Sequence, residues 1–154
     1  MGFINCCAIV AVYLVHNLIE NEMEAKNLRM GNWVQDEHGI TQYVYRLWKG
    51  GAELAEDENG GDDLDYTEDE IFGIPINEQW LEKAGFKSGL IDNYKSFSVG
   101  NDTFLCSGGD AVWIDKLIDG ETYSVGLCGA KYVHELQNLF FAITGRELEL
   151  KTDV

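Results

Sequence analysis

Two tight turns in the second half of the chain limit the possible fold more than any other feature of the sequence. Asp-Gly occurs at residues 119–120 and Gly-Asn-Asp at residues 100–102, each between two runs rich in strand-forming residues. Asp-Gly in this setting is the strongest short-range signal of a β-hairpin. The sequence therefore predicts a four-stranded antiparallel meander, whose strands are Tyr94–Val99, Thr103–Ser107, Ala111–Ile118 and Glu121–Leu127.

Apolar spacing predicts two helices around this meander. Tyr132–Thr144 has apolar residues at helical spacing and is followed by Gly145, so we expect a helix that lies across the sheet. Ile76–Gly85 is a shorter candidate of about two turns, in which Asn77 is a good N-cap and the terminal glycine can end the helix.

The N-terminal half favours strands. Leu28–Asp36 and Ile40–Trp48 are rich in strand formers and are separated by a short turn at residues 37–39, a hairpin of the kind that opens a barrel-like sheet. The predicted fold class is α+β: an antiparallel sheet or meander with a short middle helix and a C-terminal helix packed on one face. We expect a single domain over residues 23–154.

The charge is concentrated in one segment. The chain has 27 acidic and 11 basic residues, a formal net charge of −16, which argues against direct binding of nucleic acid through its phosphates. Between Gly50 and Glu82 there are twelve acids and no base. We expect residues 50–70 to form a solvated, mobile loop, with a cation site or an acidic docking surface as the alternatives. The candidate acidic surface comprises Asp57, Glu58, Asp62, Asp63, Asp65, Glu68, Asp69 and Glu70.

The first residues are an apolar leader, residues 1–22, which allows three interpretations. Phe3–Ile19 is apolar but contains two asparagines and a histidine, and it is short for a transmembrane helix. It is a packed element, a weak membrane anchor, or sequence that precedes a true start at Met23, which is the interpretation we favour slightly.

No pattern of catalytic residues stands out, and we predict no metal and no cofactor. His134–Asn138 differs from the HExxH zinc motif because asparagine replaces the second histidine. No GxSxG, P-loop or dinucleotide fingerprint occurs. The C-terminal helix nevertheless gathers hydrogen-bonding groups on one face, which bind a ligand or tie the helix to strand ends. The binding candidates are His134, Gln137, Asn138 and Phe141.

Three segments together resemble a group of small uncharacterised proteins from phages, prophages and mobile elements of Bacteroides-like bacteria. They are Leu28–Val34 (LRMGNWV), Ile74–Phe86 (IPINEQWLEKAGF) and Tyr132–Gly145 (YVHELQNLFFAITG). The resemblance covers most of the chain from Met23 onward and carries no known activity with it.

We therefore expect a non-enzymatic accessory protein of phage or mobile-element origin, cytoplasmic in its bacterial host, which acts by contact with an unknown protein partner. One alternative is an acidic DNA mimic that inhibits a host nucleic-acid-binding or defence protein. A second alternative is an enzyme with an unrecognised site near the C-terminal helix. A third is a domain tethered to a membrane through residues 3–19.

Overall fold

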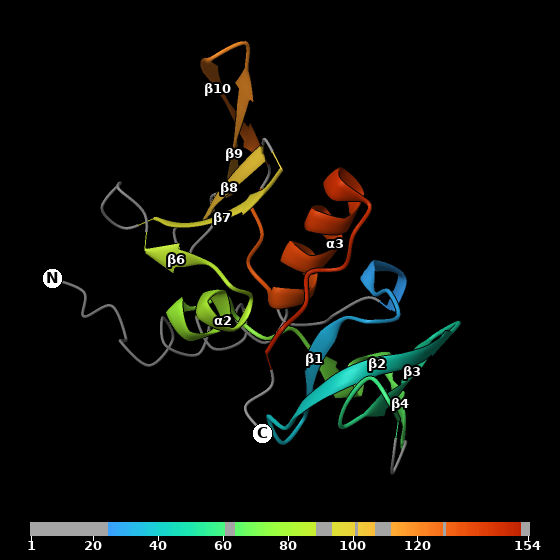
Figure 1. The fold of residues 1–154 in the computed structure, drawn as a ribbon. Helices are drawn as coiled ribbons and strands as arrows, with labels where there is room; N and C mark the ends of the chain where they lie inside the picture. Colours follow the sequence, from blue (N-terminus) through green and yellow to red (C-terminus); the bar gives the residue numbers. More distant parts are fainter. Residues whose placement is uncertain are drawn as a thin grey trace, which may run out of the picture. The chain divides into compact units, whose positions relative to one another are not determined.

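The computed structural model describes residues 25–60, 64–88, 94–100, 102–106, 112–127 and 129–151 (Figure 1). These residues divide into two compact units, the first made of residues 25–30 and 34–73 and the second of residues 31–33 and 74–151. Each unit contains a five-stranded antiparallel sheet, and the predicted α+β class is confirmed. The expectation of one domain over residues 23–154 stays a prediction.

The sheet of the first unit has the strand order β4-β3-β2-β1-β5 and forms a half-barrel, as the N-terminal hairpin led us to expect. The pairing of β2 with β3 shifts between Val44 and Arg46, and such a bulge bends and twists a strand. The elements are η1 (Ala25–Asn27), β1 (Trp33–Asp36), β2 (Thr41–Trp48), β3 (Gly51–Ala55), β4 (Leu64–Thr67), η2 (Glu68–Glu70) and β5 (Ile71–Phe72).

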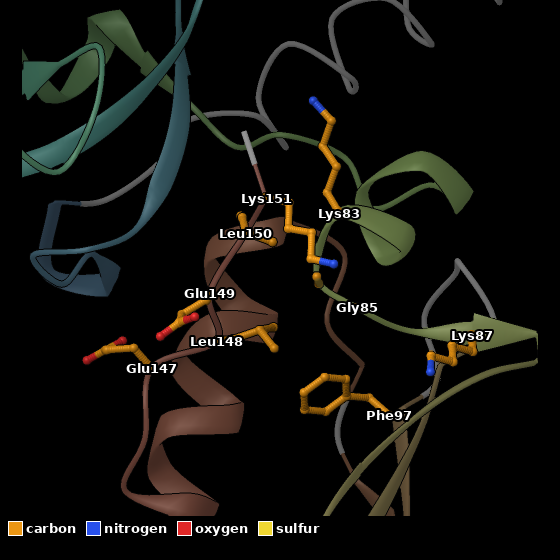
Figure 2. Close-up of a pocket in the computed structure, with 10 residues that line it drawn as sticks. Lys83, Gly85, Lys87, Phe97, Glu147, Leu148, Glu149, Leu150 and Lys151 are labelled. Atoms are coloured by element: carbon orange, nitrogen blue, oxygen red, sulfur yellow. The ribbon is translucent and has the colours of Figure 1, made fainter. Parts of the chain in front are cut away.

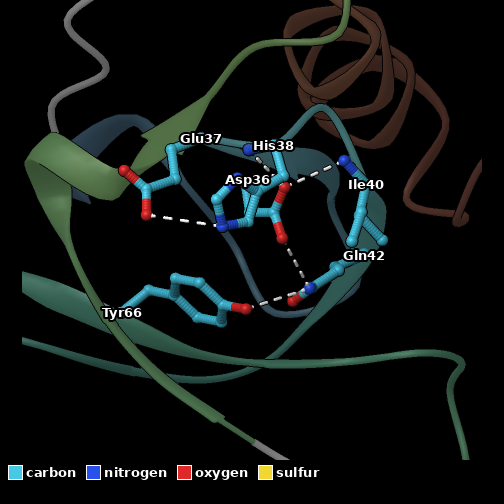
Figure 3. Close-up of polar contacts among 6 residues, drawn as sticks. All are labelled: Asp36, Glu37, His38, Ile40, Gln42 and Tyr66. Atoms are coloured by element: carbon cyan, nitrogen blue, oxygen red, sulfur yellow. Dashed lines mark hydrogen bonds and ion pairs between the residues drawn. The ribbon is translucent and has the colours of Figure 1, made fainter.

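The buried carboxylate of Asp36 holds the turn between β1 and β2 (Figure 3). Its Oδ1 accepts hydrogen bonds from the backbone N–H groups of His38 and Ile40, both at 2.9 Å. Its Oδ2 accepts a third from Gln42 Nε2 at 3.3 Å, and the same amide group donates to Tyr66 Oη at 3.1 Å. The carboxylate therefore caps the backbone N–H groups of the turn, and these hydrogen bonds compensate for the loss of water on burial.

Strands β3 and β4 correct the prediction of a loop over residues 50–70. They pair antiparallel, with Ala52 opposite Tyr66 and Leu54 opposite Leu64. Ala52 and Leu54 are fully buried in the core of the first unit, and Tyr66 packs against that core. The loop prediction failed because β3 has a single acid and four buried residues, whereas most acids of the segment lie after it, and on β4 only Tyr66 packs against the core.

The sheet of the second unit has the strand order β10-β9-β8-β7-β6, and its last four strands in the chain are the predicted meander. At the β9–β10 turn Asp119 and Gly120 have φ values of 53° and 86°, as a type I′ hairpin turn requires. The elements are α2 (Glu78–Lys83), β6 (Lys87–Ser88), β7 (Lys95–Val99), β8 (Asp102–Cys106), β9 (Val112–Ile118), β10 (Glu121–Leu127) and α3 (Val133–Thr144).

Helix α3 packs on this sheet through Phe140, which confirms the predicted position of the C-terminal helix. The Phe140 ring lies 5.0 Å from the Phe104 ring and 5.7 Å from the Phe97 ring, measured between centroids. The Phe97 ring also lies 5.5 Å from that of Phe86. The helix ends where predicted, because Gly145 has φ 67° and its N–H donates to Phe141 O.

Helix α2 begins at the predicted cap, where Asn77 Oδ1 accepts a hydrogen bond from the Trp80 N–H at 3.0 Å. The side chain of Lys95 on β7 joins this helix to the sheet: its Nζ lies 2.7 Å from Glu82 Oε1 and 2.9 Å from Glu78 Oε1. The hydrogen bond to Glu82 raises the pKa of Lys95 most, and the hydrogen bond to Glu78 raises it further. The hydrogen bond from Lys95 in turn lowers the pKa of Glu78. Both charged states are thus favoured by the fold.

Within the described part of the chain, no helix has the length and apolar character needed to cross a membrane. The apolar leader, residues 1–22, and the candidate start at Met23 lie outside the described residues, so the three interpretations of the leader stay open.

Candidate functional site

Two of the binding candidates on α3 hold the segment before β1. The amide of buried Gln137 makes two hydrogen bonds to main-chain atoms: its Oε1 accepts from the Trp33 N–H at 2.8 Å, and its Nε2 donates to the Gly31 carbonyl at 3.0 Å. Asn138 Oδ1 accepts from Asn32 Nδ2 at 3.0 Å. Both side chains therefore tie the helix to the start of a strand, which is the structural role weighed against ligand binding in the sequence analysis.

These contacts link three segments that are far apart in the sequence: Leu28–Val34, Ile74–Phe86 and Tyr132–Gly145. The Gly-Asn-Trp of the first segment contacts the Gln-Asn of the third. The second segment joins them, because the Val133 N–H donates to the Ile74 carbonyl and the Ile76 N–H to the Lys131 carbonyl, both at 2.9 Å. Hydrogen bonds thus join residues 31–33, 74–76 and 131–138 to one another within the second unit.

His134 is buried in the second unit, with 3 % of its surface exposed. Its ring stacks on that of Tyr132, with the centroids 5.7 Å apart and the planes 10° from parallel. Its Nδ1 has no hydrogen-bond partner among the described residues. Burial lowers the pKa of His134, and the nearby Glu135 carboxylate opposes that shift only in part. The neutral imidazole is therefore the favoured form, and it acts as a packed ring.

Phe141, the remaining candidate on α3, is 37 % exposed and lies on a different face from buried Phe140. The structure thus brings together Gln137 and Asn138 on one hydrogen-bonded segment, while it places His134 in the core and Phe141 at the surface. The ligand-binding role of these four residues stays a prediction.

The candidate acidic surface lies on the β3–β4 hairpin and on η2. Asp57, Glu58, Asp65, Glu68 and Asp69 are exposed, and Glu70 is partly covered, whereas residues 62 and 63 lie outside the described residues. Glu70 Oε2 accepts hydrogen bonds from the N–H and the hydroxyl of Thr67, and these bonds lower the pKa of Glu70. The hydrogen bond with Thr67 also lowers the pKa of Asp69.

One acidic residue of the hairpin has a local counter-charge. Glu53 on β3 lies directly opposite Asp65 on β4, and like charges in that position repel each other. On the other side of β3, Arg46 Nη1 on β2 lies 3.1 Å from Glu53 Oε2. Glu53, whose side chain is only 14 % exposed, is therefore part of the fold, whereas Asp57, Glu58 and Asp65 are exposed to solvent.

Among the described residues, no group of three histidine, cysteine, aspartate or glutamate side chains is close enough to share a metal ion. Cys106 is buried in the second unit. A buried cysteine packs as a small apolar core residue.

A pocket that the sequence analysis did not identify lies in the second unit, between the end of α2, strand β7 and the segment that follows α3 (Figure 2). Its volume is about 450 Å³. One signal could have indicated it: Glu147–Lys151 alternates charged and apolar residues, as an extended segment with one buried side does. Lys87 and Lys151 belong to no recognisable sequence motif, so their spacing alone could not identify them as residues of a pocket.

Comparisons with protein-family models, with curated proteins and with solved structures found no match to this chain.

Proposed function

We propose that this protein is a non-enzymatic accessory protein that binds a basic protein partner through the exposed carboxylates of its β3–β4 hairpin. The observation that carries the proposal is the pairing of β3 with β4, because it holds Asp65 on a strand and anchors the start of the segment that contains Glu56, Asp57 and Glu58. The resemblance to small phage and mobile-element proteins supports an accessory role in a bacterial host, where a cytoplasmic location fits.

The density and sign of the charge define the chemistry of the partner. Twelve of the sixteen net negative charges lie between Gly50 and Glu82, where no lysine or arginine occurs. A surface of one sign attracts a partner of the opposite sign over distances of about a Debye length, roughly 8 Å at physiological salt. The partner is therefore a protein with a lysine- and arginine-rich surface.

The pairing of β3 with β4 also favours the more specific alternative, in which the protein imitates DNA. A DNA mimic has to hold its carboxylates at fixed positions, and a mobile loop does this poorly. Antiparallel pairing fixes the position of exposed Asp65, and the Glu70–Thr67 hydrogen bonds fix the turn after β4. The partner in this version is a protein that binds nucleic acid through the same basic surface.

The test is a variant that removes charge and keeps the fold. The neutralised variant is Glu56→Gln, Asp57→Asn, Glu58→Gln and Asp65→Asn, which leaves Glu53 with Arg46 and Glu70 with Thr67. The control removes the same number of exposed charges from other places. It is Glu37→Gln, Asp119→Asn, Glu121→Gln and Glu149→Gln.

Each form is immobilised and exposed to bacterial lysate at low salt, and the retained proteins are identified by mass spectrometry. We expect the wild-type and control proteins to retain the same basic, nucleic-acid-binding proteins and the neutralised variant to lose them. DNA added in excess should displace them if the protein is a DNA mimic. Retention of the same partners by the neutralised variant contradicts the proposed surface, and retention of none by the wild-type protein contradicts the proposed function.

A further inference from the structure

We infer that the pocket of the second unit binds a small organic anion with an aromatic body, held by Lys87 and Lys151. This inference is independent of the proposed function, because every residue of the pocket belongs to the second unit and none to the acidic hairpin.

The size of the pocket is the first argument. Its volume of about 450 Å³ lies in the range of roughly 300–1,000 Å³ that is typical of small-molecule sites. Such sites combine apolar walls with a few polar groups that orient the ligand. This pocket has both, because its lining includes Phe97, Leu148 and Leu150 together with charged side chains.

The apolar part of the pocket is suited to a ring. Phe97 is only half-buried although the rings of Phe86 and Phe140 pack against it, so part of its surface faces the pocket. Leu148, which is 3 % exposed, points toward the same space in Figure 2. An aromatic ligand would gain both apolar burial and a ring–ring contact with Phe97.

The charged part of the pocket is positive. Figure 2 shows the ammonium groups of Lys87 and Lys151 directed toward the pocket, while the carboxylates of Glu147 and Glu149 point away from it. Lys83 also points away, and its ammonium group lies 5.0 Å from the centre of the Trp80 ring. Two cations at the rim of an apolar space select an anion.

The absence of internal partners for these two lysines strengthens the argument. Within the described ranges, neither Lys87 nor Lys151 forms an ion pair through its side chain, although the chain has an excess of acids. Lys95 and Arg46, in contrast, are paired with glutamates. The pocket therefore offers two cations that a ligand carboxylate or phosphate can neutralise.

The ligand class is tested by calorimetric titration of the full-length protein with phenyl phosphate, phenylacetate, benzyl alcohol and inorganic phosphate. We expect saturable binding of phenyl phosphate or phenylacetate and at least about tenfold weaker binding of the neutral alcohol and of inorganic phosphate. The preferred anion distinguishes a phosphate ligand from a carboxylate ligand. Equal binding of benzyl alcohol, or no saturable binding of either aromatic anion, overturns the inference.

The location is tested with Lys87→Met plus Lys151→Met, which keeps the apolar stems of the side chains, and with Lys131→Met as a control outside the pocket. We expect the double variant to lose about tenfold or more in affinity and the control to bind as the wild-type protein does. In the wild-type protein, NMR shifts caused by the ligand should centre on Gly85, Phe97 and Leu148. Unchanged affinity of a folded double variant, or shifts centred elsewhere, overturns the assignment.

Discussion

At the residue scale, several polar side chains are buried at positions where only other parts of the fold can supply their hydrogen-bond partners. Asp36 and Gln137 are both buried, and each compensates for its loss of water by hydrogen bonds to backbone groups. His134 is different, because its Nδ1 is buried without a partner among the described residues. A neutral imidazole tolerates that environment better than a charged one, so His134 links stability to pH.

The free energy of unfolding should fall as the pH is lowered from about 7.5 to about 5.5. Burial holds the pKa of His134 below its ordinary value of 6.5, so the unfolded chain takes up a proton more readily than the folded chain. The stability that depends on a neutral His134 is complete above pH 6.5, and it is lost as the pH falls toward the lower pKa that His134 has in the folded protein. The slope is at most about 1.4 kcal/mol per pH unit.

Urea unfolding of the wild-type protein and of His134→Phe at several pH values measures this effect. Phenylalanine preserves the ring stacked on Tyr132 and removes the titrating group, so the variant should have a flatter profile. His38→Asn is the control, because it removes a histidine that is exposed to solvent. Identical slopes for the wild-type protein and His134→Phe would show that the buried histidine has no such role.

At the element scale, hydrogen bonds and ion pairs as well as aromatic contacts hold the helices of the second unit in place. The Phe140 contacts hold α3 against the sheet, and Lys95 holds α2 against β7. The amide of Gln137 joins α3 to the segment that leads into β1. Because that amide satisfies one buried donor and one acceptor of the backbone, its removal leaves both without a partner.

We expect Gln137→Leu to lower the free energy of unfolding by about 2–4 kcal/mol, since each buried polar group left unpaired costs about 1–3 kcal/mol. Gln35→Leu is a matched control, because the Gln35 amide makes a single, longer hydrogen bond of 3.4 Å to the Gly73 carbonyl. Its loss should cost less than about 1 kcal/mol. Denaturant unfolding decides the matter, and a cost for Gln137→Leu no larger than that of the control would be inconsistent with the proposed link.

At the scale of the whole molecule, the excess of negative charge opposes folding. The net charge is −16, and most of it comes from residues 50–82. Mutual repulsion of these carboxylates is largest in the compact state and is reduced when salt screens it. The Debye length falls from about 30 Å at 0.01 M to about 8 Å at 0.15 M, so moderate salt removes most of the long-range repulsion.

The protein should therefore become more stable as sodium chloride rises from about 0.01 M to about 0.15 M, by about 1 kcal/mol or more. The variant with Glu56, Asp57, Glu58 and Asp65 neutralised should be more stable than the wild-type protein at low salt and should respond less to salt. Thermal unfolding at a series of salt concentrations checks both expectations. A wild-type protein that loses stability as salt is added would show that attractive ion pairs dominate instead.

The sequence alone determined β1, β2 and most elements of the second unit, because turn residues and apolar spacing act locally. Asp119-Gly120 specifies a hairpin, Asn77 begins α2, and Gly145 ends α3. The tertiary structure decided the rest, because the partner of a side chain depends on which distant segment lies beside it. The contact of Gln137 with Gly31 and Trp33 and the pocket beside Phe97 join residues that are far apart in the chain. The pairing of β3 with β4 spans a shorter distance, but it depends on the core in which Ala52 and Leu54 are buried.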